Sequence, residues 1–138
     1  MDAYPTVLLL HMDDKRWADF RSILGKQPVA TVSARTCAEA LKILQSETAP
    51  AIIFADVNAF EDKWAEVLSL PRRSPVPVNL VVVSAVCDVS LCVAAMEAGA
   101  FDFIVPPIAD ADLGYVLKRA VDHARTRRNR VAAMAKTA

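Results

Sequence analysis

Residues Ala51–Asp56 read AIIFAD, an apolar run that ends in a single aspartate. A short run without polar alternation is typical of a strand that is buried on both faces of a parallel sheet. Two further runs have the same character, Thr6–His11 (TVLLLH) and Val78–Ser84 (VNLVVVS). We therefore predict that these three segments are the central strands of one sheet.

Two weaker runs complete the predicted sheet. Pro28–Ser33 (PVATVS) is more polar and β-branched, which suits a strand near an edge. Phe101–Val105 (FDFIV) is short and is ended by Pro106 and Pro107, because proline cannot donate to a strand ladder. The sequence thus predicts five strands.

Amphipathic segments separate the strands, and this alternation is typical of repeated βα units. The third such segment, Asp62–Leu70, is predicted to end before Pro71, with residues 71–77 forming a rigid loop. The fourth, Val89–Ala98, is predicted to end at Gly99 as a helix C-cap. Right-handed crossovers then favour an open α/β fold with the flavodoxin-like strand order 2-1-3-4-5 and helices on both faces.

The length of 138 residues suits one domain, and no apolar run approaches the roughly 18 residues that a membrane span needs. The first residues do not resemble a secretory signal, so we expect a cytoplasmic protein. Cysteines Cys37, Cys87 and Cys92 show no C-x-x-C spacing, and we expect them to be small apolar core residues.

The charge is distributed unevenly along the chain. Residues 1–110 carry 9 Lys and Arg against 14 Asp and Glu, whereas residues 111–138 carry 7 against 2. We divide the chain into a domain of residues 1–124 and a basic helical extension or linker of residues 125–138. The arginines of the extension lack interleaved aromatic residues, so we do not expect the domain to bind nucleic acid.

Polar side chains follow the predicted strands at their carboxyl ends, where ligands gather in sheets of this order. Asp13 and Asp14 follow the first strand, Asp56 ends the third and Ser84 ends the fourth. Carboxylates grouped in this way suit Mg²⁺, with Asp13 and Asp56 as candidate ligands and Asp14 as a further one. A carboxylate beside Mg²⁺ can act as a nucleophile toward a phosphoryl group.

Structural roles remain open for each of these residues. Asp13 or Asp14 could cap the first helix, a role that is compatible with metal binding. Asp56 could be a turn residue that ends a strand, and a small residue such as Ser84 is ordinary at that position. His11 is interpreted as a neutral residue at the edge of the pocket.

The segment Met96–Pro107, MEAGAFDFIVPP, resembles the pattern A-x-x-A-G-A-x-D-Y-L-x-K-P of the receiver domains of bacterial response regulators. The resemblance covers about residues 5–122. It implies that Asp56 is the phosphoacceptor and that Ser84 and Phe103 are the switch residues. It also implies that Pro107 follows a cis peptide bond.

The chain departs from the family pattern around the same pocket, and the comparison therefore predicts an atypical, degenerate receiver. The acidic pair after the first strand is replaced by Met12 and Asp13, or by His11 and Met12 in the alternative register. Pro106 replaces the usual lysine and brings neither a charge nor a backbone N–H. The loop after Asp56 also lacks the family's proline and glycine.

The resemblance implies a signalling module of a two-component or phosphorelay system, and not an enzyme beyond self-phosphorylation from a donor. The implied partners are a histidine kinase or phosphotransfer protein, together with an output domain or partner protein. The latter would bind the face made by the fourth helix, fifth strand and fifth helix, where a homodimer could also form. The alternative is a metal-dependent or small-molecule enzyme on a flavodoxin-like fold.

Overall fold

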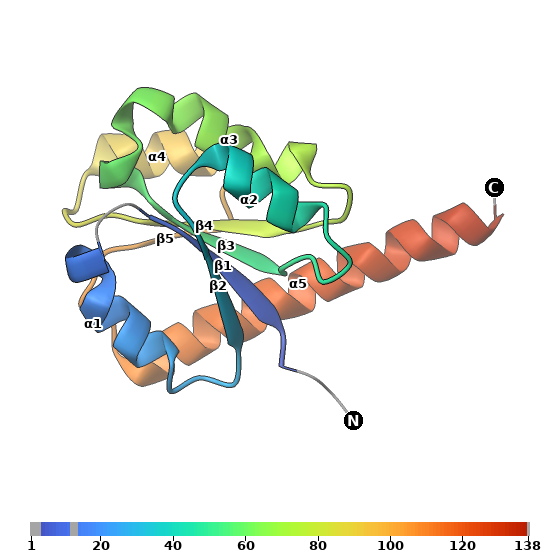
Figure 1. Ribbon diagram of the computed structural model, residues 1–138, viewed down its shortest axis with the longest axis horizontal. Coiled ribbons are helices and arrows are strands. Elements are labelled where there is room, and N and C mark those ends of the chain that lie inside the picture. Colours follow the sequence, from blue (N-terminus) through green and yellow to red (C-terminus); the bar gives the residue numbers. More distant parts are fainter. Residues whose placement is uncertain (1–3, 12–13, 138) are drawn as a thin grey trace.

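A computed structural model describes residues 4–11 and 14–137 (Figure 1). Within these residues five parallel strands form one sheet in the predicted order β2-β1-β3-β4-β5. The strands are β1 (Thr6–Leu10), β2 (Ala30–Ala34), β3 (Ile52–Asp56), β4 (Asn79–Val83) and β5 (Asp102–Ile104).

Helices cover both faces of the sheet, as predicted. In Figure 1, α1 and α5 lie on one face, while α2, α3 and α4 lie on the other. The helices are α1 (Asp14–Leu24), α2 (Cys37–Leu44), α3 (Trp64–Arg73), α4 (Val89–Glu97) and α5 (Asp110–Thr137), and two short 3-10 turns, η1 (Val57–Ala59) and η2 (Glu61–Lys63), precede α3.

The central strands divide the core into two layers. Successive side chains of a strand point to opposite faces, so Leu9 and Phe54 pack toward α1 and α5 while Leu8 and Ile53 pack toward the other helices. All four of these side chains are fully or almost fully buried. The edge strand β2 is largely exposed instead, which agrees with its more polar sequence.

Two helix ends show clear capping, and the one at Gly99 confirms the prediction. Thr36 caps α2, and its Oγ1 accepts a hydrogen bond from the backbone N–H of Glu39 at 3.1 Å. Gly99 follows α4 with a φ of 103°, and its N–H donates to the carbonyl of Met96. A left-handed residue in this position is a common way to end a helix, and glycine adopts it without steric cost.

The predicted end of the third helix is wrong. The helix α3 continues through Pro71 to Arg73. Proline removes one intrahelical hydrogen bond, but here it lies in the last turn, where the N–H of Ser74 still donates to the carbonyl of Leu70 at 3.1 Å. Burial of Val67 and Leu70 holds this turn against the core, and packing outweighs the local cost of proline.

The expectation for the cysteines holds for only one of the three. Cys37 is buried in the core layer beneath α2, and its burial, with a smaller effect of Glu66, raises the pKa of its thiol. Cys87 is exposed and Cys92 is half-buried. Both lie around the start of α4, where the helix leaves part of its surface to solvent.

The long helix α5 extends beyond the body of the domain, and Figure 1 shows its last turns free of the sheet and of the other helices. The proposed boundary between residues 124 and 125 falls inside this helix. The apolar positions Leu113, Leu117, Ala120 and Ala124 are buried, and the helix becomes exposed after them. Among the described helices, none has both the length and the apolar composition needed to cross a bilayer.

Arg128 anchors α5 to the opposite end of the sheet from the predicted site. Its Nε donates to the carbonyl of Pro77 at 2.8 Å and one terminal nitrogen donates to the carbonyl of Pro50 at 2.7 Å. These carbonyls belong to the loops that lead into β4 and β3. Burial of the guanidinium, and to a smaller degree the charge of Arg125, lowers the pKa of Arg128.

A second polar contact fixes the same helix about two turns earlier. Asn79, at the start of β4, is buried, and its Nδ2 donates to the carbonyl of Ala120 at 2.8 Å. The same amide nitrogen lies 3.1 Å from Nδ1 of His123. The direction of α5 therefore depends on hydrogen bonds as well as on apolar packing.

Replacing Arg128 by alanine should lower the free energy of unfolding by about 1–3 kcal/mol, because two half-buried carbonyls would lose a charged donor. Urea denaturation of the variant and the wild type measures this difference. Arg127→Ala, on the exposed side of the same turn, should change stability by less than about 0.5 kcal/mol. Equal effects of the two substitutions would contradict the anchoring role of Arg128.

Candidate functional site

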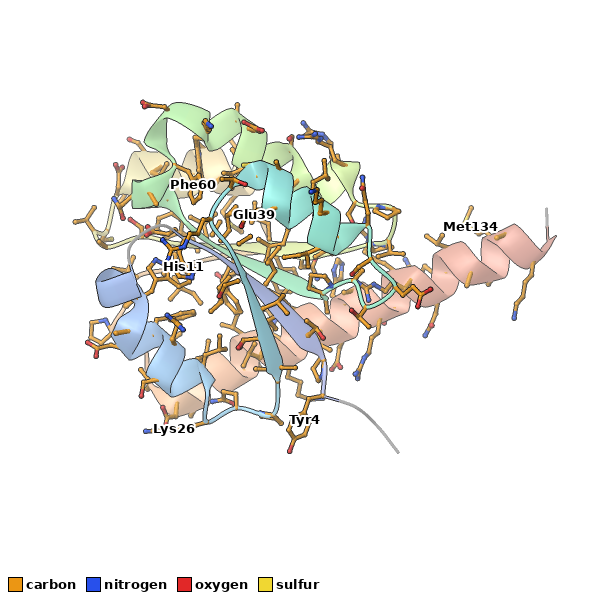
Figure 2. All side chains as sticks on the ribbon, in the orientation of Figure 1. Tyr4, His11, Lys26, Glu39, Phe60 and Met134 are labelled. Carbon is orange, nitrogen blue, oxygen red and sulfur yellow. The ribbon has the colours of Figure 1, made fainter. Side chains whose placement is uncertain are left out.

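The carboxyl ends of the parallel strands meet at one edge of the sheet and bring Asp56 and Ser84 onto adjacent strands. Asp56 is the last residue of β3 and is 2% exposed. Ser84 directly follows β4 and is fully buried. His11 directly follows β1, and Figure 2 shows it at the same edge, near the start of α1.

The two carboxylate oxygens of Asp56 have different surroundings. Oδ1 accepts a hydrogen bond from the backbone N–H of Asn58 at 3.0 Å, so Asp56 caps the turn η1. Oδ2 is buried and has no hydrogen-bond partner among the residues that the structure describes. The turn-residue interpretation of Asp56 is thus correct for one oxygen and leaves the other unexplained.

The polar groups that follow β4 bond within the loops. The hydroxyl of Ser84 donates to the carbonyl of Val86 at 2.8 Å, which turns its proton toward its own loop. The backbone N–H of Ala85 donates to Oδ1 of Asn58 at 2.9 Å. Asn58 therefore connects the loop after β3 to the loop after β4, and it lies between Asp56 and Ala85 in a short chain of hydrogen bonds.

A pocket of about 200 Å³ opens beside Asp56. Aromatic and aliphatic side chains make most of its wall, and its polar residues, Asp56 and Ser84, lie at the ends of β3 and β4. Its described lining consists of Trp17, Phe20, Asp56, Val83, Ser84, Ala85 and Pro106.

The aromatic side of the pocket is built as a series of ring contacts between α1 and the sheet. Trp17 stacks on His11 with ring centroids 5.3 Å apart, and Trp17 and Phe20 form a T-shaped contact at the same centroid separation. Phe20 in turn contacts Phe54 of β3. Because all four rings are buried, the position of α1 over the pocket is fixed by packing.

The remaining predicted residues lie around the end of β5. The peptide bond between Pro106 and Pro107 is cis, as the sequence resemblance implied. Pro106 lines the pocket. Phe103 is half-buried on the other face of the sheet, packed against the core layer under α2, α3 and α4. The structure thus places Phe103 beside the helices and not in the pocket lining.

The predicted metal ligands are placed only in part. Met12 and Asp13 lie outside the described residues, and the side chain of Asp14 is not described, although its backbone begins α1. No group of three or more His, Cys, Asp or Glu that could hold a metal ion occurs in the described ranges. The described lining supplies Asp56 as its single carboxylate, which by itself does not meet the preference of Mg²⁺ for several oxygen ligands.

Sequence reasoning missed three residues of the site. Trp17 and Phe20 were not predicted to line the pocket, because helical spacing does not say which core residues reach a pocket. The bridging role of Asn58 was not predicted either. The sequence did carry a signal for the hydrogen bond that the backbone N–H of Asn58 donates to Asp56, because aspartate side chains typically bond the backbone two residues further on.

Comparison with known proteins identifies the fold. The structure matches a response regulator from Thermotoga maritima with a TM-score of 0.72 and 24% identity, over 86% of this chain and 98% of that one. It also matches a protein ascribed to pilus assembly from Burkholderia pseudomallei with a TM-score of 0.76 and 21% identity, over 92% and 96% of the two chains. The chain has the fold of receiver domains, as the resemblance implied.

A third match concerns a larger protein. NtrX from Brucella abortus aligns with a TM-score of 0.74 and 23% identity over 96% of this chain, but over only 29% of its own length. No family model matches the sequence, and no curated protein matches it.

Asn58→Ala should release the backbone N–H of Ala85, because the acceptor of its hydrogen bond is removed. Hydrogen exchange measured by NMR should show the amide of Ala85 exchanging up to about tenfold faster, the effect of losing one ordinary hydrogen bond. Asn129→Ala, an exposed asparagine of α5, serves as the control and should leave this amide unchanged. An unchanged rate in Asn58→Ala would show that the bridge does not hold the loop.

Proposed function

We propose that the chain is a receiver-like signalling module of a two-component or phosphorelay system, which acts by protein–protein contact and not by turnover. The observation that supports this best is the juxtaposition of a buried Asp56, a buried Ser84 and the cis Pro106–Pro107 bond at one sheet edge. The fold alone would not suffice, because one fold can host many functions. A cytoplasmic location, expected from the sequence, is part of the proposal.

Asp56 occupies the position of a phosphoacceptor. In such a reaction a carboxylate oxygen attacks the phosphorus of a donor, a new O–P bond forms, and the donor's leaving group departs with the electrons of the broken bond. The donor would be a histidine kinase or a phosphotransfer protein. Neighbouring cations must neutralise charge on the transferring oxygens, and this electrostatic effect is usually the largest single contribution.

The described lining of the pocket supplies no such cation. Pro106 contributes neither charge nor a backbone N–H, and Mg²⁺ would need Asp13 in addition to Asp56. The hydroxyl of Ser84 and the N–H of Ala85 are already bonded within the loops. We therefore propose that Asp56 accepts phosphoryl groups poorly and that signalling depends on the surface of the domain.

Incubation with acetyl phosphate and Mg²⁺ should leave the mass of the protein unchanged, because the charge stabilisation of the transfer is incomplete. Intact-protein mass spectrometry checks this without needing a kinase. Asp56→Asn, treated in parallel, controls for modification elsewhere in the chain. A phosphoryl mass increment present only in the wild type would show that Asp56 is a working acceptor.

The α4–β5–α5 face is the surface best suited to a partner. Val89, Val93 and Met96 of α4 are 70%, 49% and 43% exposed and follow one another at helical spacing. Val86, in the loop before α4, is exposed as well. This apolar stripe is the signature of an interaction site, because single exposed apolar residues are ordinary but contiguous ones are not.

The α5 part of the face carries an aromatic and cationic group. The guanidinium of Arg119 lies 5.2 Å from the ring centroid of Phe101 and 5.4 Å from that of Tyr115. Tyr115 is itself 65% exposed. Tyrosine and arginine often provide much of the binding energy at protein interfaces, which supports the use of this face for an output domain, a partner protein or a second copy.

Self-association through this face should be abolished by Val93→Asp, because the substitution places a charge in the centre of the apolar stripe. Light scattering after size exclusion, over a range of concentrations, should give a dimer mass for the wild type and a monomer mass for the variant. Val131→Asp on the projecting part of α5 is the control, since Val131 is similarly exposed. A wild type that stays monomeric throughout would rule out a second copy as the occupant.

A further inference from the structure

Three properties of the pocket beside Asp56 together indicate the kind of ligand that it can bind. The pocket is a cavity of about 200 Å³ at the carboxyl edge of the sheet. Its walls are mainly aromatic and aliphatic, and the rings of Trp17 and Phe20 belong to them. A carboxylate lines it, and none of the other described residues that line it is charged.

The carboxylate is unusual because half of it is unsatisfied. Asp56 is only 2% exposed, yet its Oδ2 has no hydrogen-bond partner in the described part of the chain. A buried acceptor without a donor destabilises the folded state, and more so when it is charged. A ligand that brings an N–H donor and a positive charge to Oδ2 would remove that cost.

The neighbouring polar groups do not meet this need. Ser84 donates its proton to the carbonyl of Val86, and Ala85 donates its N–H to Asn58. Both donors are therefore turned away from Oδ2. The donor that satisfies Asp56 has to come with the ligand.

The aromatic walls select the same kind of ligand. Aromatic rings attract cations placed over their faces, and tryptophan does so best. Trp17 and Phe20 also offer apolar contact for the alkyl or planar body that carries the charge. A bare metal ion has no apolar body to pack against this surface, whereas an organic cation would use both the rings and the carboxylate.

We propose that the Asp56 pocket binds an organic cation with N–H donors, an alkylammonium or guanidinium group, either as a free small molecule or as the end of a side chain of a partner protein. The cation donates to Oδ2 of Asp56 and packs against Trp17 and Phe20. This site is separate from the α4–β5–α5 face, so the two proposals stand or fall independently.

The test is a titration of the full chain, followed by two-dimensional ¹⁵N–¹H NMR at constant ionic strength. Butylammonium and methylguanidinium are the free probes, and lysine and arginine with both termini capped represent partner side chains. Tetramethylammonium, which has the charge but no N–H donor, is the matched control ligand. Trp64, on α3, provides an internal reference, because its indole signal should stay in place while that of Trp17 moves.

We expect saturable shifts of the Trp17 indole and the Ala85 amide with the N–H cations, and at least tenfold weaker binding of tetramethylammonium. Asp56→Asn should weaken binding at least tenfold, whereas Asp122→Asn, which alters an exposed ion pair on α5, should leave it unchanged. Stronger binding of the capped residues than of the free probes would assign the pocket to a partner side chain. The reverse order would assign it to a free small molecule.

Several results would overturn the proposal. These are the absence of saturation in the folded wild type, equal binding by Asp56→Asn, and equal binding of tetramethylammonium. Saturation that appears only after Lys15 and Arg16 of α1 are both replaced by alanine would assign the pocket to a cation of the chain itself. Dimerisation measured on the same samples shows whether the α4–β5–α5 proposal survives such a failure.

Discussion

The burial of a parallel hydrogen-bond ladder on both faces is the constraint on which this structure depends. The strands β1, β3 and β4 are covered by helices on each side, so their side chains must be apolar except at the strand ends. Because parallel strands all end at the same edge, polar residues can appear only where the ladder stops. The burial of Asp56 beside Ser84 follows from this arrangement, and both need other polar groups or a ligand to satisfy them.

Most of the fold could be predicted because it depends on this same pattern. The apolar runs identified the strands, and right-handed crossovers favoured the strand order that the structure has. The helix end at Pro71 was wrong because local rules do not include the burial of Val67 and Leu70, which holds the last turn. The position of Asp56 was predictable, but the bond from Ala85 to Asn58 depends on how two loops meet, which no spacing within either loop encodes.

The site shows how the residues around a carboxylate limit what a pocket can do. A lysine next to a buried carboxylate would hold it in an ion pair, whereas Pro106 brings no charge and Asp56 shares the pocket with rings and aliphatic groups. Asn58 satisfies one oxygen of Asp56 through its backbone N–H and accepts the N–H of Ala85 through its side chain. The second oxygen of Asp56 has no hydrogen-bond donor among the described residues. This unsatisfied acceptor sets the chemistry of the pocket.

The hydrogen bonds of Arg128 fix the orientation of α5 relative to the sheet at that residue. Beyond that residue the helix projects past the sheet to Thr137. The orientation of this last part relative to the domain is therefore set by the backbone hydrogen bonds of the helix itself. Each residue of an α-helix advances the chain by about 1.5 Å and rotates it by about 100°. A group fused after Arg128 would therefore face a direction set by the number of intervening residues, and inserting a single residue would turn it to another side of the domain.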